Sequence, residues 1–385
     1  MGRRVRYIGS FSVKTLHALF NNTMLKLLCR EFPGEVICHA SKSALRHLDT
    51  SGCAKVSKLY VYAGNGKPAV LFRYMLSLFH NIRILLLSKK SDILFYNYNN
   101  VFALRALDFL NRRLRRDIVI CCHGEMEFLS LPAEGLHSYK RVMSALVRGY
   151  FNPRSEPAPG MRFIVLGDVI LKNMRPYLSQ TMYSRFLSLD HPFETPVLQA
   201  DTTDRTFIRK GRNLNVGTIG ILNEHKGSDS YLRLIRSINA RHLPVTFHTV
   251  GHIQCDPEPF RKEGVVMASR TNEPLPPAQF ADAVSNLDYL LFFYGKDKYR
   301  LTASGALLDA VRFRKPIIAL RNEYFDYFFS KFGKVGYLAD SIEEMERLLL
   351  HPDRLCMDFD FDGIVRKLIG SSDSFRLQHL WLPES

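Results

Sequence analysis

Residues 213–228 read NLNVGTIGILNEHKGS, a stretch typical of a strand that runs through a glycine turn into a helix. The apolar residues from Asn213 to Ile219 predict the strand, Gly220 predicts the turn, and Ser228 stands where a helix cap is expected. Such strand-to-helix turns bind phosphates in parallel α/β sheets, because free backbone N–H groups and the positive end of the helix dipole point at the ligand. The stretch therefore predicts an α/β fold with an anion site at this turn.

The same alternation of short apolar runs and amphipathic stretches extends along the chain, as in βαβ units with a mostly parallel sheet. We predict strands at 4–8, 35–39, 58–62, 93–96, 117–122, 162–166, 213–219, 245–250, 264–267, 289–293, 316–320 and 336–338, with helices such as 14–31, 69–79, 101–114 and 138–150. This pattern indicates two Rossmann-like doubly wound domains facing a central cleft, residues 1–195 and 213–370. A polar linker at 196–212 would join them, and the tail 371–385 is expected to pack back on the first domain.

The composition fits two globular cores, since 46% of the 385 residues are hydrophobic and 23% are charged. Seven cysteines form no CxxC pair and no ligand spacing with histidine, which disfavours a zinc site and a disulfide framework and indicates a reducing cytoplasm. No apolar signal-peptide core follows the basic N-terminus. No apolar run approaches the roughly 18 residues of a spanning helix; the longest are pieces such as 289–294 and the segment 82–87, which contains Arg83. We therefore expect a cytoplasmic protein with at most peripheral membrane contact.

The net charge of +16 is unevenly distributed, because residues 1–150 hold 23 Lys and Arg against 9 Asp and Glu, a surplus of 14. A one-sided surplus is typical of a polyanionic partner, such as nucleic acid, an anionic bilayer or an acidic substrate, although ordinary solvated helix faces are the alternative. The densest cluster comprises Arg112, Arg113, Arg115 and Arg116. No nucleic-acid-binding signature accompanies it, and aromatic residues do not interleave with it, so no nucleic-acid partner is predicted.

A second anion-binding pattern lies at residues 294–310, which read YGKDKYRLTASGALLDA. Small residues at the predicted helix start leave backbone N–H groups bare for an anion, and a carboxylate one turn deeper can accept hydrogen bonds from a ribose diol. Two such helix starts in one domain predict a diphosphate ligand. The candidate donor-binding residues in these two stretches are Gly220, Lys226, Lys298, Arg300, Thr302, Ser304, Gly305 and Asp309.

The order of these elements resembles the donor domain of GT-B fold glycosyltransferases, especially the retaining type of glycosyltransferase family 4. The resemblance covers residues 213–340 well and the N-terminal half loosely. It implies that Lys226 holds the diphosphate, that the Val-Gly element at Gly251 borders the base, and that Asp309 binds the ribose. Two positions depart from the family pattern: Ile221 replaces an arginine and Leu301 replaces the first glutamate of a pair. Lys298 or Arg300 is the candidate substitute for that arginine.

In the first half, the predicted strand 117–122 leads into a histidine and two acids at a strand's carboxyl end. His123 is similar to the family histidine that reaches the donor sugar, with a purely structural histidine as the alternative. Glu125 or Glu127 is the candidate base if the reaction inverts, since an acceptor hydroxyl needs a carboxylate or imidazole within hydrogen-bond reach. Gly9 and Ser10, after the first strand, form the candidate acceptor-side loop.

A possible metal motif, DFDFDG at 358–363, resembles a DxD site or the start of a calcium loop. Ile369 stands where a calcium loop needs a bidentate glutamate, so a surface loop or edge strand is predicted here. No metal and no cofactor are predicted for the protein.

Together these features predict a glycosyltransferase that moves a sugar from a nucleotide-diphosphate sugar to a glycan or lipid-linked glycan acceptor, in bacterial surface polysaccharide biosynthesis. It would work in the cytoplasm, peripherally at the inner face of the membrane. The alternatives are a nucleotide-sugar epimerase of the same fold and a non-catalytic protein that binds polyanions or sugar nucleotides.

Overall fold

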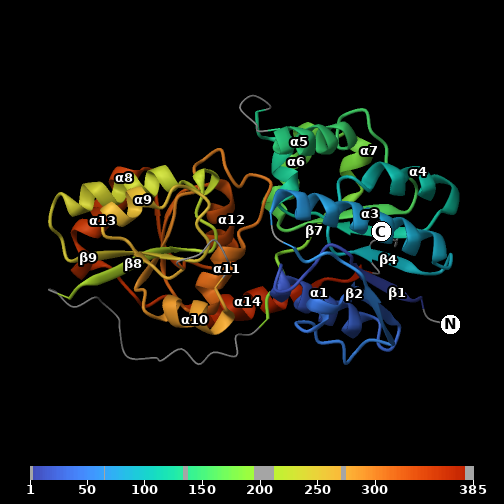
Figure 1. The fold of residues 1–385 in the computed structure, drawn as a ribbon, viewed down its shortest axis with the longest axis horizontal. Coiled ribbons are helices and arrows are strands. Elements are labelled where there is room, and N and C mark those ends of the chain that lie inside the picture. The colour runs from blue at the N-terminus through green and yellow to red at the C-terminus, as the bar shows by residue number, and fades with distance from the viewer. Residues whose placement is uncertain (1–2, 65, 133–137, 195–211, 270–274, 378–385) are drawn as a thin grey trace. The chain divides into compact units, whose positions relative to one another are not determined.

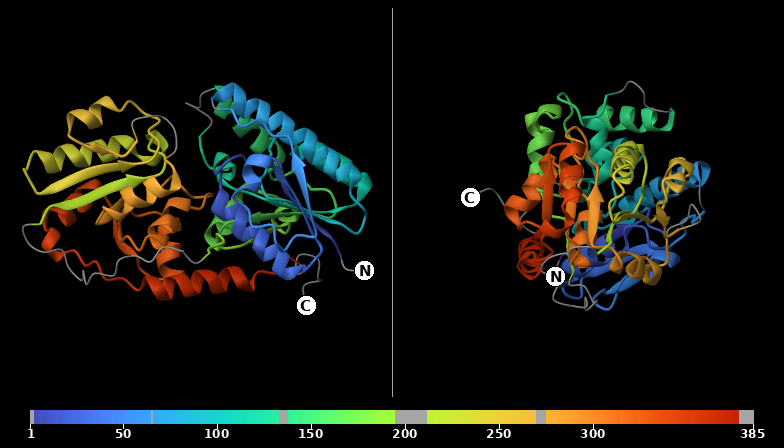
Figure 2. Two further views of the ribbon diagram at one scale, coloured as in Figure 1. Left: turned by 60° about the horizontal axis from the view of Figure 1, so that its bottom comes forward. Right: turned by 90° about the vertical axis from the view of Figure 1, so that its left-hand side faces the viewer.

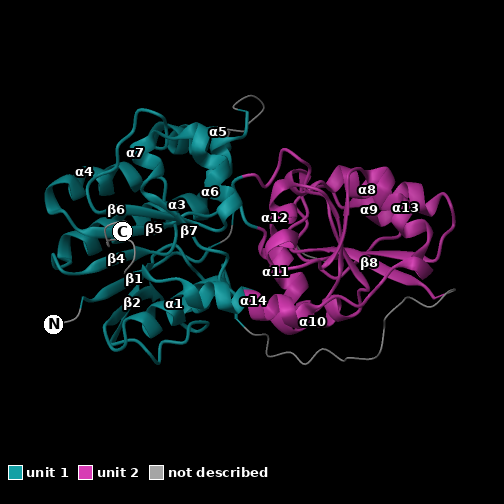
Figure 3. Cartoon of the chain, turned by 180° about the vertical axis from the view of Figure 1, so that it is seen from behind, with its two compact units in different colours: residues 1–194, 301–303, 368–385 teal, residues 195–300, 304–367 magenta. Residues whose placement is uncertain are grey.

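The computed structural model describes residues 3–64, 66–132, 138–194, 212–269 and 275–377. The chain forms two compact units (Figure 3): unit 1 comprises residues 1–194, 301–303 and 368–385, and unit 2 comprises 195–300 and 304–367. Each unit has one parallel sheet with helices packed against it (Figure 1), which confirms the predicted doubly wound α/β class. The predicted linker 196–212, apart from Arg212, and the last eight residues of the predicted tail lie outside the described residues.

The sheet of unit 1 has seven strands in the order β3-β2-β1-β4-β5-β6-β7, and every neighbouring pair is parallel. Its order reverses between β1 and β4, and open α/β sheets bind ligands at the carboxyl ends of the strands around such a reversal. The strands are β1 (Val5–Gly9), β2 (Val36–Ser41), β3 (Lys55–Leu59), β4 (Ile93–Tyr96), β5 (Asp117–Cys121), β6 (Met161–Val165) and β7 (Phe186–Ser188).

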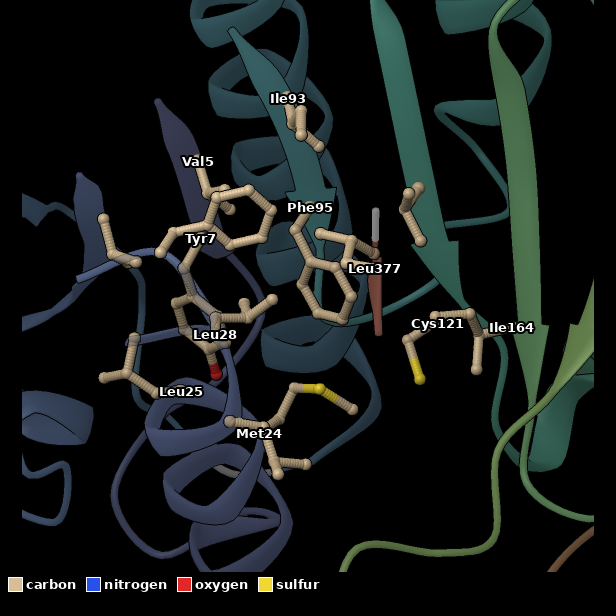
Figure 4. Close-up of a cluster of buried hydrophobic side chains, with 14 of the residues drawn as sticks. Val5, Tyr7, Met24, Leu25, Leu28, Ile93, Phe95, Cys121, Ile164 and Leu377 are labelled. Atoms are coloured by element: carbon tan, nitrogen blue, oxygen red, sulfur yellow. The ribbon is translucent and has the colours of Figure 1, made fainter. Parts of the chain in front are cut away.

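Two helices of unit 1 bear on function, α1 (Ala18–Glu31) and α3 (Lys67–Leu87). The others are α2 (Lys42–Leu45), α4 (Leu104–Leu114), α5 (Ser138–Tyr150), α6 (Asp168–Met174) and α7 (Gln180–Tyr183), with 3-10 turns η1 (Gly124–Leu129) and η2 (Arg175–Tyr177). The core under α1 (Figure 4) includes Leu28 of the helix and Tyr7 of β1. It also includes Leu377, which is fully buried and whose N–H donates to Glu31. Residues near the C-terminus therefore complete the core of unit 1.

Helix α3 corrects two expectations from the sequence. It continues to Leu87, well beyond the predicted end at Phe79. It is also long and apolar enough, by length and composition, to cross a membrane: residues 68–87 have a mean hydropathy of 1.4, with 39% of the window buried. The count of uninterrupted apolar residues missed it because Arg73, His80 and other polar residues interrupt the run. Since α3 joins β3 to β4 within one parallel sheet, one of its faces packs on that sheet.

The sheet of unit 2 has six parallel strands in the order β10-β9-β8-β11-β12-β13, with its reversal between β8 and β11. The strands are β8 (Leu214–Ile219), β9 (Val245–Val250), β10 (Val266–Met267), β11 (Tyr289–Phe292), β12 (Ile317–Leu320) and β13 (Gly336–Ala339). The helices are α8 (Ser228–Asn239), α9 (Glu258–Lys262), α10 (Pro277–Ser285), α11 (Gly305–Arg312), α12 (Glu323–Lys331) and α13 (Ile342–Leu350), with 3-10 turns η3 (Glu224–Lys226) and η4 (Pro352–Arg354).

The last helix, α14 (Phe361–Ser374), starts among residues of unit 2 and ends among residues of unit 1. Of the predicted loop or edge strand at 358–363, residues 358–360 form a loop as expected, whereas 361–363 are the first residues of this helix. Asp360 accepts a hydrogen bond from the N–H of Gly363 at 2.8 Å, as a helix cap does. One of the alternating aspartates, Asp360, therefore caps helix α14. Among the described residues, no group of His, Cys, Asp or Glu side chains could hold a metal ion.

Candidate functional site

The candidate donor site of unit 2 lies at the carboxyl ends of β8 and β11, the two strands on either side of the sheet reversal. Gly220 ends β8 with φ +77°, a left-handed conformation that favours glycine. Its backbone pairs with the loop after β9, since the Gly220 N–H donates to Val250 at 2.9 Å and the His252 N–H donates to the Gly220 carbonyl at 3.1 Å. A Cβ at Gly251 would lie 2.2 Å from the Gly220 carbonyl oxygen. Gly251 is therefore required by the close approach of the two loops, and Gly220 is favoured by its left-handed backbone conformation.

Lys226 lies at the centre of this group. A Cβ at Gly220 would be 3.8 Å from its ammonium nitrogen, and the same nitrogen lies 5.8 Å from the ring centre of Tyr294. Its charge also lowers the pKa of Asp309 on α11. The strand-end turn, the loop after β11 and helix α11 thus surround one cation, which suits an anionic ligand.

Asp309 is partly buried, with 32% of its side chain exposed. This burial raises its pKa from 3.8 to about 6, while the nearby charges of Arg312 and Lys226 lower it. Arg312 Nη1 lies 3.8 Å from a carboxylate oxygen of Asp309. The carboxylate is therefore mostly ionised at neutral pH and can accept hydrogen bonds from hydroxyl groups.

The start of α11 is capped by Ser304, whose buried hydroxyl accepts the Leu307 N–H at 3.3 Å. The Ser304 hydroxyl thus has a structural role at this position. A Cβ placed on the exposed Gly305 would meet no atom within 4 Å, so this helix start is open for an approaching group. The unpaired backbone N–H groups of a first helical turn can donate hydrogen bonds to an anion.

The remaining predicted donor residues are engaged in other contacts. The Lys298 ammonium donates to the Glu224 carbonyl at 3.0 Å, and its partial burial lowers its pKa. Arg300 lies 3.8 Å from a carboxylate oxygen of Glu323. Thr302 belongs to unit 1, where its hydroxyl lies 3.4 Å from the Gly124 carbonyl. The structure thus brings Gly220, Lys226, Gly251, Gly305 and Asp309 into one group, with Lys298 beside it.

In unit 1, the end of β5 places His123 in a cluster of aromatic rings. Its ring lies 4.7 Å from that of Phe20, edge to face, and 5.8 Å from that of Tyr98. Its Nε2 lies 3.0 Å from the Asn97 carbonyl, so this nitrogen carries the proton and Nδ1 is an acceptor. Burial lowers the pKa of His123 to about 3, and the imidazole is therefore neutral at physiological pH.

The two acids after His123 have different environments. Both carboxylate oxygens of Glu125 lie 3.0 Å from the His123 N–H, and burial raises the pKa of Glu125 to about 7. Glu127 is also buried, but one of its oxygens accepts the N–H of Leu301 at 2.8 Å. Glu125 is thus poised to exchange a proton near neutral pH, whereas Glu127 holds the segment 301–303 in unit 1.

The candidate acceptor-side loop at Gly9 and Ser10 ends β1, beside the reversal of the sheet. Ser10 is buried, and its hydroxyl bonds to Ser77 at 2.8 Å and to Asn81 at 2.6 Å, both on α3. The side chain of Ser10 therefore ties this loop to α3. The acceptor-side role of the loop stays a prediction.

Sequence reasoning missed a group of amides that follows β4. Asn97 and Asn99 are fully buried, and their side-chain oxygens have no hydrogen-bond partner among the described residues. Asn99 also lowers the pKa of Glu125 by a hydrogen bond. The available signal was the run Tyr96-Asn97-Tyr98-Asn99 directly after a buried strand, because a buried amide normally serves a partner.

Comparison with known proteins identifies the fold. No protein-family model and no curated protein matches the chain. Among solved structures, Anabaena HepE in complex with UDP and glucose has a TM-score of 0.54 at 12% identity, covering 96% of this chain and 94% of that one. The lipopolysaccharide outer core galactosyltransferase WaaB in its apo form has a TM-score of 0.54 at 11% identity, covering 96% of both chains.

A third similar structure is the catalytic domain of starch synthase IV from Arabidopsis thaliana bound to ADP and acarbose. It has a TM-score of 0.52 at 14% identity and covers 98% of this chain and 96% of that one. These structural neighbours are GT-B glycosyltransferases, and the likeness extends over nearly the whole chain. The protein therefore has the GT-B fold.

Proposed function

We propose that the protein is a glycosyltransferase that transfers a sugar from a nucleotide-diphosphate sugar. The arrangement of Lys226 between the Gly220 turn and Asp309 is the observation that carries this proposal. A diphosphate fits the ammonium and the open start of α11, and a ribose diol fits a carboxylate that is ionised at neutral pH. The solved structures with UDP and with ADP are of the same fold, which supports the nucleotide class.

The finer assignment to the retaining type of family 4 is part of this proposal. The spacing of Lys226, Gly251 and Asp309 supports it, while Ile221, which is 41% exposed, and the buried Leu301 depart from the pattern. Glu127 is a candidate replacement for the glutamate that the family pattern has at position 301, because its carboxylate accepts the N–H of Leu301. If the reaction instead inverts, Glu125 is the favoured base, since a pKa of about 7 matches general base catalysis at neutral pH.

The proposed acceptor is a glycan or lipid-linked glycan of a bacterial surface polysaccharide, reached from the cytoplasm at an anionic membrane surface. The surplus of 14 positive charges in residues 1–150 supports a negatively charged acceptor side. All seven cysteines are free, which supports a reducing compartment. The epimerase alternative needs catalytic acids near the diphosphate; Asp309 lies near Lys226, and Glu224 and Asp229 lie near Lys298.

Nucleotide binding is tested by thermal unfolding with UDP, ADP, GDP and CDP and their sugars. A ligand at a hundredfold excess over its dissociation constant stabilises the folded unit by about 2.7 kcal/mol. Lys226→Ala should abolish this gain. The matched control is Lys262→Ala, an exposed lysine on α9 of the same unit, which should keep it. If no nucleotide raises the melting temperature of the parent, the donor site is wrongly assigned.

Catalysis is tested separately, by measuring the release of free nucleoside diphosphate with candidate glycan acceptors. A transferase releases it in proportion to acceptor consumed. Tight nucleotide binding without such release, for any acceptor in the panel, would favour the non-catalytic alternative. Interconversion of two sugar nucleotides without release would instead favour the epimerase.

A further inference from the structure

Helix α3 exposes a continuous set of large apolar side chains. Each of them is between 47% and 67% exposed: Leu71, Phe72, Met75, Phe79, Leu86 and Leu87. They extend over 17 residues of helix, or about 25 Å. Figure 2 shows α3, coloured light blue, along the outside of unit 1. Soluble monomers rarely leave so many neighbouring apolar groups exposed unless the surface binds something.

Unlike an ordinary surface helix, α3 buries several of its polar residues, although Arg83 is exposed. Ser77 and Asn81 bond to Ser10, and Arg73 donates to the carbonyls of Tyr62 at 3.0 Å and Gly64 at 2.9 Å. All three of these α3 residues are less than 10% exposed. A helix that satisfies its polar groups internally and turns its apolar residues outward is adapted to an apolar surrounding.

Two tyrosines extend this apolar surface beyond the helix. Tyr60 is 69% exposed and Tyr62 is 42% exposed, in the segment that follows β3. The ring of Tyr62 lies 5.6 Å from that of Phe72, edge to face, and His80 Nε2 donates to the Tyr60 carbonyl at 2.8 Å. Both tyrosines are thus held beside α3. Tyrosine is enriched where a membrane meets water, because its ring is apolar and its hydroxyl is polar.

The charge around this surface has one sign. Residues 51–91 contain no Asp or Glu, and their basic residues are Lys55, Lys58, Lys67, Arg73, Arg83, Lys89 and Lys90. Lys58, Arg83, Lys89 and Lys90 are exposed, and none of these four forms a salt bridge with a described residue. An apolar strip beside unpaired cations complements a surface with an apolar interior and anionic headgroups.

We propose that the exposed face of α3, with Tyr60 and Tyr62, inserts into the headgroup region of an anionic lipid bilayer. The helix lies in the plane of the interface, its apolar residues reach the acyl boundary, and the surrounding lysines and arginines contact anionic phosphates. The inference deepens the membrane location that is part of the proposed function, but it is argued from this surface alone and holds whether or not the chain transfers a sugar.

The first test is co-flotation of the full chain with phosphatidylcholine vesicles that contain or lack phosphatidylglycerol. The parent should bind only the anionic vesicles, less at high salt. Phe72→Ser combined with Phe79→Ser should lower the partition coefficient roughly 100-fold, about tenfold per ring. The matched control is Phe109→Ser on α4, which removes a ring that is 61% exposed outside this surface and should leave binding unchanged. Equal binding by the parent and the double variant would overturn the proposal.

The second test locates the surface in the bilayer. The single tryptophan, Trp381, lies outside the described residues, so Trp381→Phe provides a silent background. Phe79→Trp in this background should shift its emission to the blue and be quenched by lipids with brominated acyl chains, whereas Phe109→Trp should not. If Phe79→Trp stays fully accessible to aqueous acrylamide on bound vesicles, insertion is refuted. If the double serine variant instead converts a dimer to a monomer without changing vesicle binding, the surface joins two copies of the chain.

Discussion

Replacing Asp309 by asparagine tests whether this carboxylate holds the ribose of the donor. The substitution keeps the size of the side chain and removes its charge. Partial burial raises the pKa of Asp309 to about 6, with Arg312 and Lys226 opposing the rise. In the parent the carboxylate is about 10% ionised at pH 5 and about 90% ionised at pH 7. Ligand affinity should therefore change across this range in the parent alone.

The size of the effect follows from the hydrogen bonds that a charged acceptor makes. Such a bond contributes about 1.5–3 kcal/mol, so Asp309→Asn should weaken nucleotide-sugar binding by about 10- to 150-fold at pH 7. If binding requires the ionised form, the affinity of the parent should rise about tenfold between pH 5 and pH 7. The same rise should be absent in the variant, whose side chain does not titrate.

The assay is calorimetric titration with a nucleotide sugar at intervals from pH 5 to pH 8. A nucleotide sugar is the better probe, because its diphosphate diester carries no group that titrates there, unlike a free nucleoside diphosphate. Arg312→Gln serves as a control that keeps the carboxylate. If Asp309→Asn binds as tightly as the parent at pH 7, Asp309 does not contact the ribose and the assignment of α11 is wrong.

The same substitution makes a prediction for stability. The folded pKa of Asp309, about 6, lies above its ordinary value of 3.8, so the contribution of this group to stability is fully present below the ordinary value and is lost as the pH rises through 6. Asp309→Asn should therefore gain stability relative to the parent above pH 6 and not below pH 4. Chemical unfolding of both proteins at pH 4 and pH 7.5 measures this difference.

Three further predictions concern the other site residues. His123→Ala should lower kcat about tenfold, as for one lost hydrogen bond in the transition state, with little change in nucleotide affinity; unchanged turnover would make the histidine structural. Gly251→Ala should abolish nucleotide binding and destabilise unit 2 by about 1–3 kcal/mol, because the new Cβ would meet the Gly220 carbonyl; a variant that melts like the parent would contradict this geometry. If Glu125 is the base, kcat/KM should rise as the pH passes about 7, and Glu125→Gln should remove that limb of the pH profile.

Buried strands were predictable from the sequence, because a strand covered on both faces is a short apolar run with polar residues at each end. The predicted strands 93–96 and 245–250 and the predicted helix 138–150 match the observed bounds. The edge strand β3 was predicted three residues too late, since its residues Lys55 to Lys58 are largely exposed and lack that pattern. Helix α3 was predicted too short, because the polar residues His80 and Asn81, which are buried in the structure, interrupt the apolar pattern of the sequence after Phe79.

Site residues were predictable where the backbone conformation requires a particular residue. They were less predictable where the site depends on contacts between side chains that are distant in the sequence. Gly220 was found because a strand-to-helix turn favours glycine, whereas Gly251 was found through the family resemblance. The environment of Glu125 depends on Asn99 from a neighbouring strand end, a contact that parallel pairing of β4 and β5 creates. Glu127 instead accepts a hydrogen bond from the N–H of Leu301, and because these residues are 174 positions apart, no local sequence pattern predicts the contact.

The position of Leu377 has a consequence for biosynthesis. A ribosome makes the first 194 residues long before it makes the segment that fills the core beneath α1. The N-terminal unit, which would ordinarily fold first as it emerges, must wait for residues 368–377 to reach its final packing. A nascent chain would therefore carry an incompletely packed first unit until this segment has been made, so that a frameshift or premature stop between residues 194 and 368 would leave the N-terminal unit exposed to chaperones and proteases.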